Sequence, residues 1–239
     1  MVLLQIHVPE GVPPATGPRS QFIPTAPKQP DFLKNIAEGE VQGTQTIKFA
    51  TPQGPLFSSH TINGHKFGDG EQQPIPVMLN TVEEWKIMNY TFPSVTTAIS
   101  HPFHIHLNPF QIVEIFDPNQ TVNSQNFGTL PKYVPNGQVQ DDSVQCPIDP
   151  NQESTWTDCH NPIDFSTPQI WWDVFPIPSG NTIGGANVPG FFRMRSRFVD
   201  FPGQYVIHCH ILAHEDRGMM AIVQLQPAGA QVPMLMTHH

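Results

Sequence analysis

The chain has 239 residues, of which 20 are acidic and 11 are basic, so its formal net charge is −9. This acidic balance excludes the basic surface that nucleic-acid binding requires, and no stretch approaches the roughly 18 apolar residues of a membrane span. The chain contains 27 prolines, more than twice the usual share of about 5%, and this predicts few long helices.

The first 43 residues differ from the rest of the chain. Residues 2–8, VLLQIHV, form a short β-prone run, and a stretch rich in proline and glycine follows it. We interpret residues 1–43 as the last strand of a preceding domain and an interdomain linker or extended arm, with one helical turn at 31–36. The opening residues lack the basic region of a signal peptide, so if the protein is exported its signal lies upstream.

From residue 44 onward, short alternating patterns of apolar and polar residues predict β-strands. The expected strands cover residues 44–51, 81–90, 104–116 with a break at Pro109, 169–177, 191–199, 204–211 and 219–226. Strands separated by turn-rich stretches are typical of a sandwich or a barrel. This predicts an all-β domain at 44–227 and a tail at 228–239. Long loop insertions are expected at 117–168 and 178–190.

Six of the 12 histidines fall in two tight clusters. The clusters are His101-Pro-Phe-His104-Ile-His106 and His208-Cys209-His210-Ile-Leu-Ala-His214. Successive side chains of a strand point to opposite faces of the sheet. His208 and His210 should therefore share one face while Cys209 points to the other. His104 and His106 should likewise point the same way. The three consecutive residues 208–210 can therefore supply a thiolate to one metal centre and two imidazoles to another.

The Cys209 face carries the ligands of a blue-copper site. His214 and Met219 follow Cys209 at intervals of five residues, spacings that let a loop curl back around a metal. With His101 they make two imidazoles, one thiolate and one thioether, which is the trigonal set of blue copper with a long axial methionine. Zinc fits less well, because its structural sites use two or more cysteines and no methionine.

The opposite face offers four imidazoles, which suit copper, iron, nickel or zinc without distinguishing them. These are His104, His106, His208 and His210. A lone His-x-His pair is often structural, but two such clusters in one chain favour metal binding. The other histidines show no such geometry, and we interpret them as ordinary polar residues or, at the C-terminus, as part of a tag. They are His7, His60, His65, His160, His238 and His239.

The two motifs resemble those of a known family. HPFHIHLNPFQIVE and HCHILAHEDRGMMAIVQL are similar to the copper motifs in the C-terminal cupredoxin domain of multicopper oxidases, the laccase family. The likeness covers residues 44–227 and implies a cupredoxin-like Greek-key β-sandwich. It also implies ligand roles: His101, Cys209 and His214 for type 1 copper with Met219 axial, His104 for type 2 copper, and His106, His208 and His210 for type 3 copper.

The resemblance implies a reaction as well. Single electrons from a phenol or an aromatic amine would enter at type 1 copper and pass from Cys209 through His208 and His210 to a three-copper cluster, where dioxygen is reduced to water. A complete cluster needs two more His-x-His motifs from an N-terminal cupredoxin domain, and nothing before His101 supplies them. The missing domains or another subunit would complete it. Two chains meeting at a symmetric interface would pool eight imidazoles.

Two other functions stay open at this point. The chain could be a single-domain blue-copper electron carrier, in which the second histidine group is idle. It could also be a copper-binding or storage module without oxidase activity. Oxygen consumption with a phenol separates the oxidase from both, and absorption from a thiolate–copper bond separates the carrier from the storage module.

The other two cysteines, Cys146 and Cys159, lie in the long loop at 117–168. Because Cys209 is assigned to copper, they are free to pair with each other. We expect a disulfide in preference to two free thiols. A disulfide suits an oxidising compartment, so we expect an extracellular or periplasmic location.

Three further features have both a structural and a functional interpretation. Trp171 and Trp172 are expected to place one ring in the core and one outside, or to form an apolar wall beside type 1 copper. Glu215 and Asp216 directly follow His214 and are candidate acceptors of a phenolic proton. The sequons that begin at Asn89 and Asn119 match the glycosylation pattern, and we favour the absence of a glycan.

Overall fold

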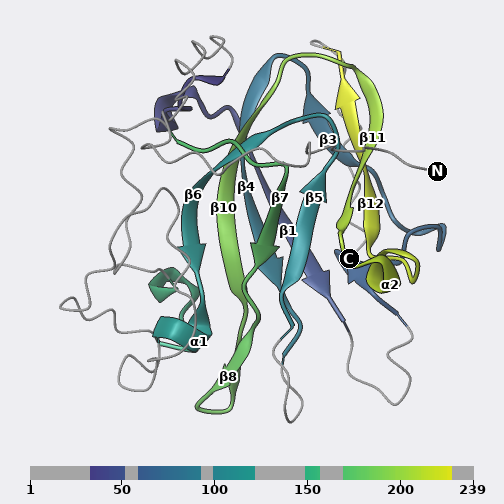
Figure 1. The fold of residues 1–239 in the computed structure, drawn as a ribbon. Coiled ribbons are helices and arrows are strands. Elements are labelled where there is room, and N and C mark those ends of the chain that lie inside the picture. The colour runs from purple at the N-terminus through teal and green to yellow at the C-terminus, as the bar shows by residue number, and fades with distance from the viewer. Residues whose placement is uncertain (1–32, 52–58, 93–98, 122–148, 157–168, 228–239) are drawn as a thin grey trace, which may run out of the picture.

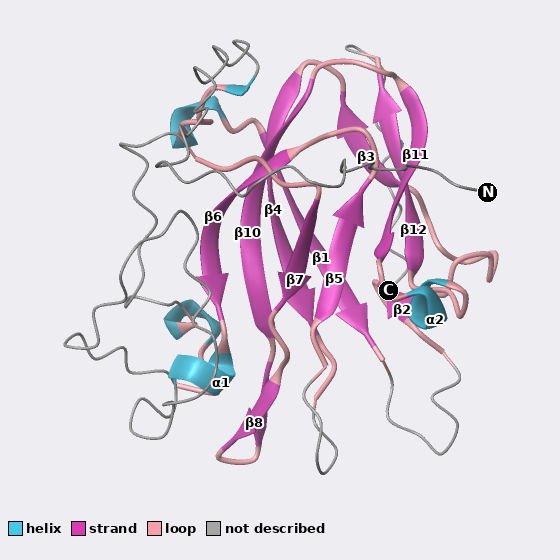
Figure 2. Ribbon diagram, viewed as in Figure 1, coloured by secondary structure: helices cyan, strands magenta, loops and turns pink. Residues whose placement is uncertain are grey.

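The computed structural model describes residues 33–51, 59–92, 99–121, 149–156 and 169–227. The strands form two sheets that face each other as a sandwich (Figure 1, Figure 2). A small two-stranded hairpin, β8–β9, extends below them (Figure 2). No helix in these residues is long and apolar enough to cross a membrane.

Each sheet has five strands. The first contains, in spatial order, β2 (Thr61–Ile62), β1 (Gly43–Ala50), β4 (Thr81–Asn89), β10 (Gly190–Phe198) and β6 (Phe110–Phe116). The second contains β3 (Ile75–Met78), β12 (Met220–Gln226), β11 (Gly203–Cys209), β5 (His101–Ile105) and β7 (Val174–Ile177). The remaining elements are β8 (Asn181–Ile183), β9 (Ala186–Val188), α1 (Pro118–Thr121), α2 (Leu212–Glu215) and the 3-10 turns η2 (Glu38–Glu40) and η4 (Glu153–Thr155).

The order of the strands is not their order along the chain. β1 runs parallel to β4, and β3 runs parallel to β12, whereas the other pairs within the two sheets are antiparallel. Parallel neighbours cannot be joined by a tight hairpin, so the chain crosses between the sheets. This arrangement is the cupredoxin-like Greek-key sandwich that the family resemblance implies.

The core between the sheets is rich in aromatic side chains. In β1 the buried residues Ile47 and Phe49 alternate with exposed neighbours, as a half-buried strand requires. The ring of Phe103 on β5 packs edge-on against Phe49, Phe110 and Phe192 at centroid distances of 6.0, 5.6 and 5.8 Å. Fully burying one such ring stabilises a fold by about 1.5–3 kcal/mol. This packing fixes β5, the strand that carries the first histidine cluster, against the opposite sheet.

Most of the predicted strands are confirmed, with two differences. The expected strand at 104–116 is two strands, β5 and β6, because the chain turns between them at Leu107, whose φ is +71°. The strand expected at 169–177 begins only at Val174. Near the second cluster, β11 ends at Cys209, and the residues that follow turn into α2.

The prediction of a loop at 178–190 is wrong, because this stretch contains the β8–β9 hairpin. Ile183 pairs with Ala186 across Gly184 and Gly185. The two glycines have φ values of +57° and +85°. A two-residue turn of type I′ requires positive φ at both positions, which glycine adopts without steric cost.

The described end of the N-terminal arm packs against the first sheet. Ile36 is buried, and its amide donates to Gln111 Oε1 at 2.9 Å. The guanidinium of Arg195 donates to the Ile36 carbonyl at 3.3 Å, and that of Arg197 donates to the Lys34 carbonyl at 2.7 Å. The helical turn expected at 31–36 falls partly outside the described residues. The division into a preceding strand, a linker, a cupredoxin domain and a tail stays a prediction.

Candidate metal centre

Strands β5 and β11 position both histidine clusters. They pair antiparallel, with His208 opposite His104 and Cys209 opposite Phe103. Phe103 and Cys209 are buried and belong to the main core. Because side chains alternate along a strand, the Cys209 face points into the sandwich and the His104 face points away from it.

Three ligand atoms converge where β5 begins and β11 ends. Cys209 Sγ lies 3.7 Å from His101 Nδ1 and 3.6 Å from His214 Nδ1, and the two nitrogens are 3.2 Å apart. A metal about 2.0 Å from each nitrogen and about 2.3 Å from sulfur, in a trigonal plane, requires separations of about 3.5 Å between nitrogens and about 3.7 Å from nitrogen to sulfur. The separations therefore fit a trigonal metal ion, and two imidazoles with one thiolate are the donor set of blue copper.

A hydrogen bond fixes which nitrogen of His101 faces this centre. His101 Nε2 lies 2.8 Å from Thr91 Oγ1, and the Thr51 amide donates to the same oxygen at 2.9 Å. The Thr91 amide donates to Asn89 Oδ1 at 2.9 Å. When Nε2 carries the proton and donates it to Thr91, Nδ1 keeps the lone pair that a metal requires.

The sequon at Asn89 belongs to this supporting structure. Asn89 is fully buried, and its Nδ2 donates to the Ile99 carbonyl at 2.7 Å. A buried amide has no room for a glycan in the folded chain, so burial supports our prediction that Asn89 carries none. At the second sequon, Asn119 is half-buried, and its Nδ2 donates to Asp117 Oδ1 at 2.9 Å and to the Ser179 carbonyl at 3.0 Å.

Main-chain hydrogen bonds hold Met219 close to the same centre. The Cys209 amide donates to the Met219 carbonyl at 3.0 Å, and the Met219 amide donates to the His214 carbonyl at 3.0 Å. Met219 is fully buried. Main-chain hydrogen bonds thus join Met219 to both Cys209 and His214. Its role as the axial ligand stays a prediction.

Burial keeps the metal-free centre uncharged near neutral pH. Burial, with smaller contributions from His214 and His60, lowers the pKa of His101 to about 3. Burial and the positive charge of Arg217 also lower the pKa of His214. Burial raises the pKa of the Cys209 thiol to about 11. Two imidazoles are therefore ready to coordinate, and a bound metal would displace the thiol proton.

A second group lies on the outer face of the same strands. The ligand nitrogens of His104, His106 and His208 lie within 4.8 Å of one another, and the Nε2 atoms of His106 and His208 are 3.2 Å apart. His104 Nδ1 lies 2.8 Å from the Asp173 carbonyl, and His208 Nδ1 lies 3.2 Å from the Cys209 carbonyl. These contacts occupy Nδ1 and leave Nε2 of both rings for a metal.

Two more of the predicted site residues, His210 and Glu215, lie beside this second group. His210 is exposed, and its ring centroid lies 5.4 Å from that of His104, but its nitrogens are outside the converging set. Glu215 Oε2 lies 3.3 Å from His208 Nδ1, so this carboxylate faces the second group. Asp216 is exposed. The role of Glu215 and Asp216 as proton acceptors stays a prediction.

His60 is a residue that sequence reasoning missed. Its interpretation as an ordinary polar residue is wrong, because it is only 2% exposed and its ring stacks on His214 at 4.1 Å with an interplanar angle of 18°. Its Nδ1 lies 2.8 Å from Thr51 Oγ1. Its Nε2 is buried with no hydrogen-bond partner among the described residues, an arrangement that typically costs about 1–3 kcal/mol.

The two tryptophans fit the structural interpretation. Trp172 packs against the core, with its ring edge-on to Phe175 at 5.2 Å. Trp171 Nε1 donates to the Leu33 carbonyl at 2.7 Å, and the Arg197 guanidinium lies 6.0 Å from its ring centre. Trp171 thus contacts the N-terminal arm, and these contacts give no support to an apolar wall beside His214.

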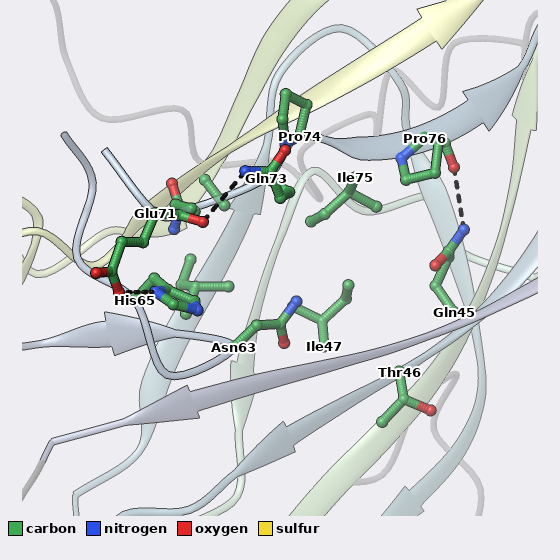
Figure 3. Close-up of a pocket in the computed structure, with 13 residues that line it drawn as sticks. Gln45, Thr46, Ile47, Asn63, His65, Glu71, Gln73, Pro74, Ile75 and Pro76 are labelled. Atoms are coloured by element: carbon green, nitrogen blue, oxygen red, sulfur yellow. Dashed lines mark hydrogen bonds and ion pairs between the residues drawn. The ribbon is translucent and has the colours of Figure 1, made fainter. Parts of the chain in front are cut away.

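A separate cavity of about 280 Å³ opens beside β1 and β3 (Figure 3). Its walls include none of the converging histidines. His65 and Glu71 lie next to each other at one end of it, with 3.8 Å between Nδ1 and Oε2, and at the other end Gln45 Nε2 donates to the Pro76 carbonyl at 3.1 Å (Figure 3). His65 is a partly exposed side chain with carboxylate neighbours, in agreement with its interpretation as an ordinary polar residue.

Several sequence predictions lie outside the described residues. The expected disulfide between Cys146 and Cys159 is one of them, and the interpretation of the remaining histidines is another. These histidines are His7, His160, His238 and His239. Cys209 is a free, buried thiol.

Parts of several known proteins are similar to this chain. A laccase from Haloferax volcanii is 26% identical over 183 residues, which cover 77% of this chain and 22% of the laccase. A laccase from Bacillus subtilis is 23% identical over 198 residues, which cover 81% of this chain and 30% of the laccase. The solved structure of a multicopper oxidase from Campylobacter jejuni aligns with a TM-score of 0.45 and 19% identity, over 78% of this chain and 30% of that chain.

The chain thus spans less than a third of the length of the two curated relatives. The sequence model of the family described as multicopper oxidase matches residues 25–229. The match covers well over half of the chain and includes both histidine clusters. The chain belongs to the multicopper oxidase family.

Proposed function

We propose that this chain is the C-terminal copper domain of a laccase-type oxidase that couples oxidation of phenols or aromatic amines to reduction of dioxygen to water. The observation that carries the proposal is the convergence of Cys209 Sγ with His101 Nδ1 and His214 Nδ1 at trigonal copper separations. The relatives named laccase support it. Bound copper would supply one-electron redox chemistry at this centre and, in a cluster of three ions, the reduction of dioxygen.

The residues of the two groups have separate roles in this proposal. The inner group, made of His101, Cys209 and His214, would hold type 1 copper, with Met219 as the axial ligand. The outer group is the set of histidines on the opposite face of β5 and β11. The outer group would provide His104 to type 2 copper and His106, His208 and His210 to the type 3 pair. Protein-fixed ligands keep the coordination geometry nearly constant between oxidation states, and the surrounding hydrogen bonds tune the potential.

Cys209 links the two groups through the chain itself. Its side chain lies on the inner face of β11, and its sequence neighbours His208 and His210 carry the outer imidazoles. The His208 ring also contacts the Cys209 carbonyl at 3.2 Å. An electron that arrives at the Cys209 side therefore has a short route across one strand, made of covalent bonds and a hydrogen bond.

The reductant would approach from the His214 side. His101 is fully buried, whereas His214 is partly accessible. The exposed Asp216 lies two residues beyond His214 and is placed to accept the proton that a phenol loses on oxidation. Glu215 faces His208, so its position suits proton transfer on the dioxygen side better than at the phenol.

The outer group is open on one side, which suits completion by a partner. His106 and His210 are exposed, and a hollow of about 350 Å³ lies over His104, His106 and Asp173. The neighbouring Leu107 side chain is 61% exposed. An N-terminal cupredoxin domain or another subunit would supply the missing imidazoles here. We also propose an extracellular or periplasmic location, based on the expected disulfide.

Anaerobic reduction by a phenol tests the proposed function. The copper-loaded chain should show thiolate–copper absorption, and a simple phenol should bleach it with one electron per copper ion while phenoxyl coupling products form. The Cys209→Ser chain, loaded in the same way, is the control and should show no band to bleach. A wild-type band that phenols leave unchanged would contradict the oxidase proposal.

A second candidate function is that of a blue-copper electron carrier. It is favoured by one specific observation, the complete inner group beside an incomplete outer group. A carrier would show the same absorption but would resist direct reduction by phenols. A storage module would bind copper without that band. Oxygen consumption by a metal-verified sample with phenol would exclude both alternatives.

A further inference from the structure

His60 reaches the inner group without belonging to it. It lies just before β2, stacks on His214 with nearly parallel rings 4.1 Å apart, and is almost completely buried. It is absent from the converging ligand set of His101, Cys209 and His214. A stacked neighbour of this kind restricts the plane of the His214 ring, and that plane decides where the Nδ1 lone pair points.

A hydrogen-bonded path connects His60 to the other imidazole of the centre. His60 Nδ1 contacts Thr51 Oγ1 at 2.8 Å, and the Thr51 amide donates to Thr91 Oγ1 at 2.9 Å. Thr91 Oγ1 in turn contacts His101 Nε2 at 2.8 Å. Thr51, directly after β1, therefore anchors both the ring that stacks on His214 and the hydroxyl that orients His101.

Packing alone does not account for an imidazole at position 60. Its Nε2 is buried and has no partner among the described residues, a situation that folded proteins avoid. A hydrocarbon ring would fill the same space without an unpaired nitrogen, but it would lose the contact with Thr51. The hydrogen bond to Thr51 holds the His60 ring in one orientation. A hydrocarbon ring at this position would be held by packing alone.

We propose that His60 is a positioning residue of the copper centre, which through its stack on His214 and its bond to Thr51 orients the imidazoles before metal arrives. The inference rests on the proposed function, because it needs copper at the inner group. Residues that orient metal ligands typically contribute about 10–100-fold to metal affinity. His60 acts through His214 and is not itself a ligand.

Copper titration of the full chain tests this role. His60→Ala should weaken Cu(II) binding at the inner group by about 10–100-fold and change the energy of the thiolate–copper band and the copper hyperfine coupling. His60→Phe keeps a stacked ring and should retain tighter binding than His60→Ala. His65→Ala is the matched control, because His65 lies outside the centre, and it should equal wild type.

Thermal unfolding of the metal-free variants separates positioning from folding. A His60→Ala chain that unfolds cooperatively near the wild-type temperature and still binds copper weakly supports the proposal. If His60→Ala does not fold, Thr51→Val removes the anchoring hydroxyl and keeps the amide. Thr51→Val should weaken copper binding, and Thr51→Ser should restore it. Wild-type affinity and an unchanged spectrum in His60→Ala, or in Thr51→Val when His60→Ala is unfolded, would overturn the proposal.

The two proposals fail in different ways. If the wild-type chain binds no copper with thiolate absorption, the proposed function is wrong. If the wild-type band is present while the His60 and Thr51 variants behave as wild type, the proposed function stands and only the positioning role of His60 is wrong.

Discussion

The Cys209 thiol is the one donor of the inner group that must lose a proton before it binds a metal. Its pKa is raised to about 11 by burial, whereas burial lowers the pKa of His101 to about 3. Around neutral pH a copper ion would therefore meet two neutral imidazoles and one protonated thiol. At the scale of single residues, burial keeps the thiol protonated and the imidazoles neutral. A metal must therefore bind thiolate strongly enough to displace this proton.

Copper affinity should therefore rise with pH. Between pH 7 and 9 one thiol proton leaves for each copper bound, because the imidazoles are already neutral and the thiol lies below its pKa. The apparent association constant should increase about tenfold per pH unit. Competition titrations against a chelator of known affinity measure the slope. A slope of zero would mean that Cys209 is not a ligand or is ionised already in the metal-free chain.

Replacing the expected axial ligand tests the role of Met219. Met219→Leu conserves volume and should keep the thiolate–copper band while raising the midpoint potential, because the thioether donates to copper and favours the oxidised ion. Redox titration followed at the band measures the potential. Met220→Leu, at the adjacent and half-buried methionine, is the control and should not change it. Equal midpoint potentials in Met219→Leu and Met220→Leu would contradict the role of Met219 as the axial ligand.

How much of the site could be predicted depends on distance along the chain. Cys209, His214 and Met219 lie within one strand end and its loop, so their spacing is visible in the sequence. His60 is brought to His214 by the pairing of β1 with β2, which places Thr61 opposite Ala50. No periodicity in the sequence indicates that pairing, and a single histidine in a loop carries no signal of its own.

At the scale of elements, the register between β5 and β11 decides which histidines meet. A shift by one residue would move His104 away from His208 and exchange the inner and outer faces. Aromatic packing of Phe103 against the opposite sheet fixes β5 in place. The alternation along each strand could be predicted from the sequence. The pairing could not, because β5 and β11 are about 100 residues apart.

The start of β10 provides a direct test of element packing. A Cβ added at Gly190 would lie 2.3 Å from the Pro178 carbonyl oxygen, a backbone atom that cannot move aside easily. Gly190→Ala should therefore destabilise the chain by about 1–3 kcal/mol, seen as a lower midpoint in chemical denaturation. Gly39→Ala has open space around its Cβ and should change stability by less than about 0.5 kcal/mol. Equal midpoints for the two variants would contradict this packing.

The β8–β9 hairpin carries a turn signal in its sequence. Gly184 and Gly185 form a two-residue turn between short strands, and Gly-Gly is among the dipeptides that favour such turns. The surrounding residues are too few to show a clear alternation. Longer strands such as β1 and β12, with eight and seven residues, show a clear alternation, whereas β2 and β3, with two and four residues, are too short for the sequence pattern to predict them.

At the scale of the whole molecule, the sandwich presents two unequal metal groups. In the inner group His101 and Cys209 are buried, His214 is partly accessible and three donor atoms converge, whereas the outer group has exposed histidines and a hollow over it. The chain also spans only 22% and 30% of the two curated laccases that it resembles. We therefore expect the inner group to bind copper in the isolated chain, and the outer group to require a partner for dioxygen reduction.

The visible absorption of the copper-loaded chain tests this account most directly. Wild type and Cys209→Ser are loaded with Cu(II), the bound metal is quantified, and the spectra are compared. The account predicts an intense thiolate–copper band in wild type that is absent from Cys209→Ser. Retention of the band in Cys209→Ser, or its absence from a wild-type chain with copper bound, would contradict the assignment of His101, Cys209 and His214 as a blue-copper site.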